Sequence, residues 1–223
     1  AAEIVHASYG RLPKQVLRCK AATLVTMHDI TPLRLSRDAV SAEQLAITRR
    51  IVRGLRHCVW VACVSEFTRR DLIEFTGRAE DRTVTIPNGV DHRIFRPRSA
   101  LESEETLVSF GLHRNPFVLS LSSLAPHKNL QLLTSSWGRV LQEVPDARFV
   151  IAGGRQSKPG DLAAAFGVEA MPSIIFTGHV TDLQFGDLAS RCQAFLFPSL
   201  YEGFGLPALE AMAAGARVIA ANN

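Results

Sequence analysis

The feature that most constrains the fold is a set of short apolar runs that recur along the 223-residue chain. The runs are rich in β-branched residues, end at turn residues, and are mostly unbroken rather than alternating in polarity. Unbroken runs of this kind are typical of parallel strands that helices cover on both faces. The predicted strands are residues 23–27, 59–64, 83–86, 117–121, 148–152, 174–176, 194–197 and 217–220.

Amphipathic stretches fill the intervals between the predicted strands. The first of them opens with Ser41 and has Gln44 three residues later, which is the pattern of a helix capping box. The predicted helices are residues 41–57, 65–75, 129–144, 182–192 and 206–214. Because strand and helix alternate throughout, the predicted class is α/β with parallel sheets.

A segment rich in turn residues divides the chain. Residues 87–116 contain Asn88-Gly89, several prolines and a cluster of acidic residues, and no convincing strand. We predict that residues 1–92 and 117–223 belong to two α/β domains and that residues 93–116 connect them. Each predicted sheet is small and the chain stops directly after a predicted strand. We therefore expect an internal piece of a longer protein, with both domains truncated and with exposed sheet edges and apolar faces.

Composition excludes several classes of protein. Hydrophobic residues make up 47% of the chain and charged residues 21%, which indicates a globular protein rather than a disordered one. No apolar run reaches the ~20 residues of a membrane-spanning helix, and the N-terminus lacks the pattern of a secretion signal. We therefore expect a cytoplasmic protein. The net charge of +4 is a mild surplus without a concentrated basic stripe, so we expect no nucleic-acid partner.

The cysteines do not form a metal site in this interpretation. Cys19, Cys58, Cys63 and Cys192 lack the paired spacing of a zinc finger. We predict ordinary reduced thiols that are largely buried. The sequence offers no other clear cluster of metal ligands, so no metal and no cofactor are expected.

The most specific stretch is residues 198–210, Pro-Ser-Leu-Tyr-Glu-Gly-Phe-Gly-Leu-Pro-Ala-Leu-Glu, directly after a predicted strand. Gly203 and Gly205 let the backbone approach a ligand closely, and the predicted helix starts at Leu206 or the proline after it. The N–H groups at such a helix start favour a diphosphate or sugar hydroxyls. Glu202 and Glu210 flank the turn and are expected to accept hydrogen bonds from hydroxyls. Taken alone, both could equally be ordinary loop and helix-start acids.

In this stretch the chain resembles the retaining, nucleotide-sugar-dependent glycosyltransferases of family 4, also called glycosyltransferase group 1. Further segments resemble the family's motifs in the same order, over essentially the whole chain. The resemblance implies the GT-B fold, in which two Rossmann-like domains with parallel sheets face each other across a cleft. The matching segments are Thr26-Met-His28-Asp29, Val64–Thr68, Ile86–Asp91, Ser123–Asn129, Val150–Gly153 and Phe176–Val180.

The resemblance also implies roles for single residues. Lys128 would grip the donor diphosphate, Glu210 would bind the ribose hydroxyls, and Glu202 would face the donor sugar. His28 would reach the transferred sugar, although a lone histidine at a strand end is more often structural. The catalytic residues would then be His28, Glu202 and Lys128, and the donor-binding residues Lys128, Gly153, His179, Val180, Glu202, Gly203, Phe204, Gly205, Leu206 and Glu210.

One position departs from the family pattern. Many members carry an arginine five residues before the lysine, where this chain has Ser123. Lys128, the helix start after Gly205, and the nearby His127 or Arg155 would then have to meet the diphosphate charge. Family members retain the anomeric configuration without a metal, and the leaving phosphate takes the acceptor proton.

The function that follows is hexosyl transfer with retention. The donor would be a nucleoside-diphosphate sugar, with GDP-mannose as the leading candidate, and the acceptor a saccharide or a lipid-linked saccharide in polysaccharide, lipopolysaccharide or glycolipid synthesis. The truncated chain alone could instead be a non-catalytic nucleotide- or sugar-binding fragment, or the fold could serve a nucleotide-sugar epimerase. Predicted helix 41–57 carries Arg49, Arg50, Arg53 and Arg56, which either form a solvated face or contact an anionic membrane at its inner surface.

Overall fold

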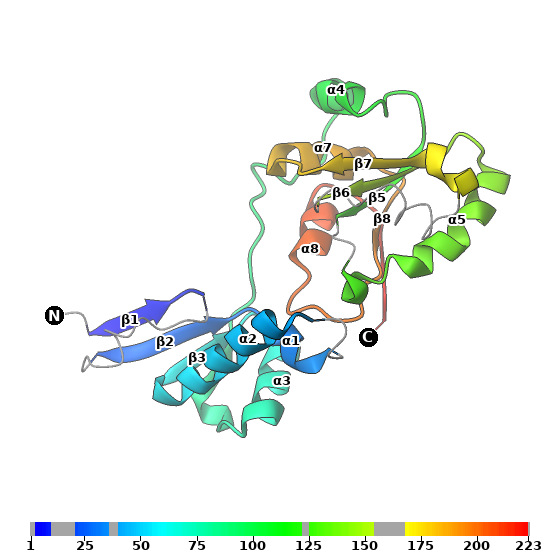
Figure 1. The fold of residues 1–223 in the computed structure, drawn as a ribbon. Helices are drawn as coiled ribbons and strands as arrows, with labels where there is room; N and C mark the ends of the chain where they lie inside the picture. The colour runs from blue at the N-terminus through cyan, green and yellow to red at the C-terminus, as the bar shows by residue number, and fades with distance from the viewer. Residues whose placement is uncertain (1–2, 10–20, 36–39, 122–124, 154–167, 223) are drawn as a thin grey trace. The chain divides into compact units, whose positions relative to one another are not determined.

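The computed structural model describes residues 3–9, 21–35, 40–121, 125–153 and 168–222. The chain folds into two compact units, and each unit has its own sheet (Figure 1). The first unit is Ala1–Gly89 with Glu202–Gly205, and the second is Val90–Tyr201 with Leu206–Asn223. All strand pairs among the described residues are parallel, as the sequence predicts.

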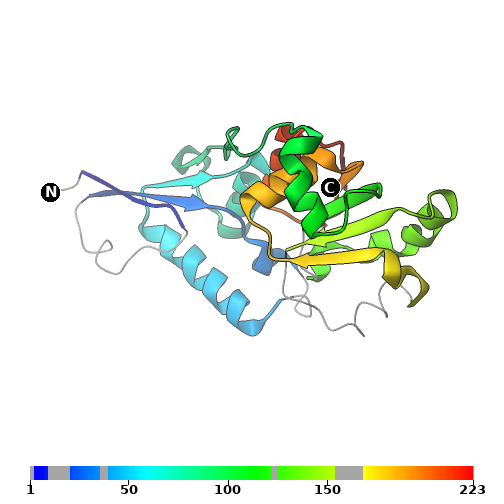
Figure 2. The same cartoon turned by 90° about the horizontal axis from the view of Figure 1, so that it is seen from above.

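The first unit holds a four-stranded sheet in the order β1-β2-β3-β4. Apolar side chains on one face of β2 and β3 pack against Leu55 and Leu72, which belong to the two helical segments that follow these strands. Figure 2 shows the long second helix running beside this sheet. The elements are β1 (Ile4–Ala7), β2 (Ala22–Met27), α1 (Thr31–Arg34), α2 (Ala42–Gly54), η3 (Leu55–His57), β3 (Trp60–Cys63), α3 (Glu66–Thr76), η4 (Glu80–Arg82) and β4 (Thr83–Thr85).

Local signals fix the ends of these helices. The predicted capping box is confirmed at α2. The Ser41 side chain accepts a hydrogen bond from the backbone N–H of Gln44, and the side-chain oxygen of Gln44 accepts one from the backbone N–H of Ser41. The side chain of Ser65 caps α3 by accepting from the N–H of Thr68. Helix α3 ends at Gly77, whose φ of 65° is a conformation that glycine adopts without steric cost.

The opposite face of the first sheet is largely uncovered in the described part of the chain. Register places Trp60 and Val84 on this face, since Ala62 pairs with Val84 and lies two residues from Trp60. Trp60 is 42% exposed and Val84 38% exposed, and the edge residue Ile4 is exposed as well. The expectation that this unit exposes an apolar sheet face is therefore confirmed.

The second unit has a five-stranded sheet in the order β7-β6-β5-β8-β9, covered on both faces. Phe149 and Ile151 face Trp137 of the helix after β5, while Leu119 and Phe195 pack with residues of the other helices. The elements are α4 (Ala100–Ser109), β5 (Phe117–Leu121), η5 (Pro126–Lys128), α5 (Gln131–Glu143), β6 (Arg148–Ala152), η6 (Val168–Ser173), β7 (Ile174–Gly178), α7 (Asp182–Arg191), β8 (Ala194–Phe197), α8 (Leu206–Ala213) and β9 (Val218–Ala220).

Helix α4 was not predicted, because the segment was interpreted as a connection. Its local signal is nevertheless clear, since Ser99 and Glu102 form a capping box. The helix is held on α7 by a buried network, in which the Thr106 hydroxyl donates to Asp187 at 2.6 Å. The Arg98 guanidinium lies 3.1 Å from the other Asp187 oxygen, and both side chains are at least nine-tenths buried. Tertiary contacts thus stabilise a helix that looked like linker in the sequence.

Several more short elements were missed, among them η4, η5 and η6, and the thiols are as expected. Strand β1 and helix α1 span only four residues each, too few for periodicity to indicate them. Cys58 and Cys63 are buried free thiols, and Cys192 is a half-buried one. Burial raises the pKa of the Cys63 thiol to about 11 and that of Cys192 to about 12. The prediction of reduced, largely buried cysteines is confirmed for these three, and Cys19 lies outside the described residues.

Candidate functional site

The strand order of the second unit locates a ligand site. From β5 the chain moves to β6 and β7 on one side, and then returns to place β8 and β9 on the other side. The strand order therefore reverses between β5 and β8, which pair directly through Val118 with Ala194 and Leu119 with Phe195. Open parallel sheets bind ligands beyond the carboxyl ends of the strands at such a switch point.

The turn after β5 carries Lys128 at this point. Lys128 closes a 3₁₀ turn that begins at Pro126, and Asn129 follows in the left-handed conformation with a φ of 53°. Two hydrogen bonds tie the turn to the segment after β8. The amide of Asn129 donates to the Pro198 carbonyl at 3.2 Å, and the N–H of Leu200 donates to the His127 carbonyl at 2.7 Å. Lys128 is therefore held beside the start of the glycine-rich stretch.

The glycine-rich stretch leads into α8 as predicted. Gly205 has a φ of 87°, which only glycine adopts readily, and the helix begins at Leu206. Gly203 is buried, whereas Glu202 and Phe204 are half-buried. The backbone thus makes a sharp turn directly before a helix N-terminus, which is a favourable position for an anion.

Glu210 lies in α8 in an unfavourable setting for a negative charge. Burial raises the pKa of its carboxyl group to about 7, and the nearby carboxylate of Asp182, the first residue of α7, raises it further. A half-buried carboxyl that is partly protonated at neutral pH is a frequent mark of a binding or catalytic site. Hydroxyl groups of a ligand could stabilise its ionised form by donating hydrogen bonds.

A hydrogen bond between two glycines joins the ends of β6 and β7. The N–H of Gly153 donates to the Gly178 carbonyl at 2.7 Å, and both residues have positive φ. His179 follows and is exposed, whereas Val180 is buried in the core. Thr181 then caps α7 with a capping box. The predicted donor-side residues thus follow four different strands at the carboxyl edge of one sheet.

His28 belongs to the first unit, directly after β2. Its Nε2 lies 2.9 Å from the Ser8 carbonyl oxygen, which follows β1. The ring of Tyr9 is tilted against the imidazole, with centroids 5.8 Å apart. The carboxylate of Asp29 accepts a hydrogen bond from the N–H of Thr31, the first residue of α1, at 2.8 Å. The contact with the Ser8 carbonyl therefore orients the imidazole.

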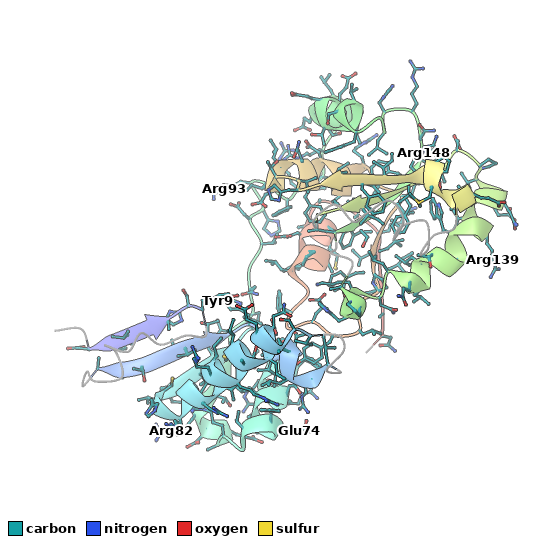
Figure 3. All side chains as sticks on the ribbon, in the orientation of Figure 1. Tyr9, Glu74, Arg82, Arg93, Arg139 and Arg148 are labelled. Carbon is teal, nitrogen blue, oxygen red and sulfur yellow. The ribbon has the colours of Figure 1, made fainter. Side chains whose placement is uncertain are left out.

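Ion pairs connect α1, which follows the turn carrying His28, to α3. Arg34 of α1 donates to Glu74 at 2.7 Å and is also paired with Asp71, which is almost fully buried (Figure 3 labels Glu74). These ion pairs connect the segment after β2 to α3. They hold α1, the helix that follows His28 and Asp29, against α3.

Some site residues were missed, and some lie outside the described residues. Asp182 was not predicted as a neighbour of Glu210, because sequence spacing does not reveal which helices are adjacent. Asn129 was predicted to start a helix, whereas the structure gives it a left-handed conformation that asparagine tolerates better than most residues. Ser123 and Arg155, which bear on the diphosphate charge, lie outside the described residues.

Two further properties of the described residues concern metals and membranes. They contain no group of three or more His, Cys, Asp or Glu side chains placed to hold a metal ion, and metal independence stays a prediction. No helix among them is long and apolar enough to cross a membrane. The predicted arginine-rich face exists on α2 and η3, where Arg49, Arg50, Arg53 and Arg56 are all exposed.

Comparison with known proteins agrees with this geometry. A glycosyltransferase family 4 model matches residues 1–93. The serotype-specific mannosyltransferase WbdA of Escherichia coli is 30% identical over 168 residues, which is 73% of this chain and 20% of WbdA. The O-antigen chain mannosyltransferase B of E. coli is 25% identical over 221 residues, which is 98% of this chain and 57% of that enzyme. The chain thus spans between a fifth and somewhat more than half of these relatives.

Solved structures identify the fold. The crystal structure of Anabaena Alr3699/HepE in complex with UDP and glucose matches with a TM-score of 0.72 at 20% identity, covering 98% of this chain and 58% of that one. This likeness confirms the predicted GT-B fold class of two Rossmann-like units. The model described as "Glycosyl transferases group 1" matches residues 103–223, which is more than half of the sequence. The chain therefore belongs to the group 1 glycosyltransferases.

Proposed function

We propose that the protein containing this chain transfers a hexose, with retention, from a nucleoside-diphosphate sugar to a saccharide or lipid-linked saccharide acceptor. The observation that carries the proposal is the junction of two turns at the switch point of the second sheet. The Lys128 turn after β5 and the stretch that leads to Gly205 after β8 are joined by the bond from Leu200 to His127. A cation and a helix N-terminus thus belong to one edge of the sheet, which suits a diphosphate.

The roles of the other residues follow from what each group can donate or accept. Glu210 is proposed to bind the ribose hydroxyls, since a partly desolvated carboxylate gains most from hydroxyl donors. Glu202 is proposed to face the hexose, and His28 to contact it from the first unit. Charge develops on the leaving diphosphate and on the sugar ring in the transition state, so oriented dipoles and Lys128 would supply most of the catalysis. No metal and no cofactor enter this proposal.

Mannose is the proposed hexose, with GDP-mannose as the leading donor. Support comes from the two E. coli relatives, whose names describe mannosyltransferases of serotype and O-antigen synthesis. Polysaccharide or lipopolysaccharide assembly is the corresponding proposed pathway.

Nucleotide titration tests this proposal directly. UDP, GDP, ADP and TDP are titrated by calorimetry into the wild-type chain and into Lys128→Ala, Glu210→Ala and Arg139→Ala. Arg139 is an exposed residue of α5 (Figure 3) and serves as the matched control. We expect one nucleotide to bind, Lys128→Ala and Glu210→Ala to weaken it at least about tenfold, and Arg139→Ala to leave it unchanged, since loss of a charged hydrogen bond costs ~1.5–3 kcal/mol. Binding that ignores Lys128 and Glu210 would contradict the proposed site.

Turnover and stereochemistry are measured separately. Transfer from the matching nucleotide sugar is followed by NMR of the anomeric proton in the product, and retention predicts the donor's configuration. His28→Ala is expected to lower transfer while the affinity for the nucleotide stays unchanged. Nucleotide binding without any transfer would favour the alternative of a non-catalytic binding fragment.

We also propose that the arginines of α2 and η3 contact an anionic membrane. Arg49 and Arg53 are four residues apart on α2, Arg56 follows in η3, and all three are exposed. Each basic residue near an anionic surface contributes ~1 kcal/mol. Arg49→Ser with Arg53→Ser should weaken co-sedimentation with phosphatidylglycerol vesicles about 30-fold, given tenfold per 1.4 kcal/mol. The control is Arg70→Ser on α3, and equal loss in the control would refute a specific role for this face.

A further inference from the structure

We propose that Ser65 and Thr68 of α3 are positioning residues, whose hydroxyls hold the glycine-rich stretch in the orientation that the donor hexose requires. Residues 202–205 of this stretch belong to the first compact unit, as does the helix that carries both hydroxyls. The inference rests on the proposed function, because it gives two further residues a role at the proposed hexose site.

Two hydroxyl groups converge on one carbonyl oxygen. The Thr68 hydroxyl donates to the Gly203 oxygen at 2.9 Å, and the Ser65 hydroxyl donates to the same oxygen. Ser65 also accepts from the N–H of Thr68 as the cap of α3, which leaves its hydroxyl hydrogen to donate. Thr68 and Gly203 are both buried. Because a carbonyl oxygen has two lone pairs, two donors satisfy it completely.

Close backbone packing seats the same residue on the turn after β2. A Cβ atom at Gly203 would overlap the His28 carbonyl oxygen and would lie 2.9 Å from the Cβ of Asp29. The turn that carries His28 therefore requires a glycine here, independently of any ligand. The hydroxyls of α3 and the backbone after β2 thus hold the stretch by two separate contacts, directly after Glu202.

Peptide geometry turns this anchoring into an orientation. The described residues contain no cis peptide bond, and in a planar trans peptide the C=O and the following N–H point in opposite directions. Because the Gly203 carbonyl points at the hydroxyls of α3, the N–H of Phe204 is directed away from them. The resemblance places Phe204 among the donor-binding residues. Release of the carbonyl would let this peptide rotate, and the N–H would lose its direction toward a bound hexose.

The effect should be confined to the hexose part of the donor. Lys128 and Glu210, which are proposed to bind the diphosphate and the ribose, belong to the second unit. The peptide held by Ser65 and Thr68 belongs to the first. A free nucleoside diphosphate has no hexose, so its affinity should not depend on the two hydroxyls, whereas the affinity for the nucleotide sugar should.

Paired calorimetric titrations of the whole chain test this, with GDP against GDP-mannose and UDP against UDP-glucose. Thr68→Val keeps the shape of the side chain and removes its hydroxyl. It should weaken the nucleotide sugar at least about fivefold, as expected when one neutral hydrogen bond is lost, and leave the matching nucleotide within about twofold. Thr68→Ser keeps the hydroxyl and should restore the affinity. Thr76→Val is the matched control, because its hydroxyl bonds to the Leu72 carbonyl within α3, and it should change neither affinity.

Carbonyl NMR of the ligand-free, carbon-13-labelled chain measures the orientation itself. Thr68→Val should shift the carbonyl resonance of Gly203 and the amide resonance of Phe204, and Thr76→Val should shift neither. Unchanged resonances in Thr68→Val would overturn the proposal. So would equal losses of nucleotide and nucleotide-sugar affinity, or a loss of sugar affinity in Thr68→Ser or Thr76→Val as large as in Thr68→Val.

The same titrations separate this inference from the proposed function. If a nucleotide binds and responds to Lys128→Ala while Thr68→Val leaves the nucleotide sugar unaffected, the positioning role fails and the donor site stands. If the wild type binds neither the nucleotides nor the nucleotide sugars, the donor site itself fails, and the role of the two hydroxyls at that site fails with it.

Discussion

Replacing Glu210 by glutamine should stabilise the unliganded protein above neutral pH. The pKa of this carboxyl is raised from 4.5 to about 7, first by burial and then by the Asp182 carboxylate. Each pKa unit corresponds to 1.36 kcal/mol, so the upper bound of the cost at high pH is about 3 kcal/mol. Because Glu210 is only half-buried, solvent screens part of this, and we take about 1–2 kcal/mol.

The pH dependence has a definite sign. A carboxyl whose folded pKa is raised contributes stability that is complete below pH 4.5 and is lost as the pH rises through about 7. Glu210→Gln removes this loss, so its advantage should be largest at pH 8, much smaller at pH 5, and absent only below about pH 4. In a domain of this size, 1 kcal/mol shifts Tm by about 2–4 °C. We therefore expect a gain of about 2–8 °C at pH 8.

Thermal unfolding by circular dichroism at pH 5 and pH 8 measures this difference. Glu105→Gln, at an exposed position of α4, is the control and should leave both melting temperatures unchanged. In the presence of the nucleotide the order should reverse, since the wild-type carboxylate binds the ribose hydroxyls more strongly than an amide does. An equal Tm for Glu210→Gln and wild type at both pH values would refute the argument that the carboxylate is desolvated.

Four further predictions concern stability and reactivity. Asp187→Ala should lower the free energy of unfolding by about 3–5 kcal/mol in urea denaturation, because it leaves the Arg98 guanidinium buried without its partner. Gly138→Ala in α5 should raise the free energy of unfolding by about 0.5–1 kcal/mol, since nothing lies within 4 Å of the new methyl group. Gly215→Ala should lower the free energy of unfolding by about 1–2 kcal/mol, because a φ of 91° is strained for alanine. Cys63, with a thiol pKa of about 11, should resist alkylation at pH 8 in the folded protein and react in urea, as peptide mass spectrometry would show.

Most strands and helices could be predicted because their signals are local. The strand at 117–121 was predicted with its observed bounds, since a buried parallel strand is an unbroken apolar run between turns. The start of α2 was predicted from Ser41 and Gln44, which satisfy each other's backbone groups. Helix α4 was missed although Ser99 and Glu102 give it a local capping signal, and its packing on α7 depends on Asp187, which lies far away in the sequence.

The sequence determined the glycine-rich turn and Glu210 as candidates, because their residue types and spacing limit what the backbone and charges can do. Lys128 became a candidate through the resemblance to the family. Strand order decided that the Lys128 turn and the stretch before Gly205 are neighbours, since β5 and β8 pair although 72 residues and two other strands separate them. Helix packing decided that Asp182 raises the pKa of Glu210. Such adjacency depends on three-dimensional packing, which local spacing does not encode.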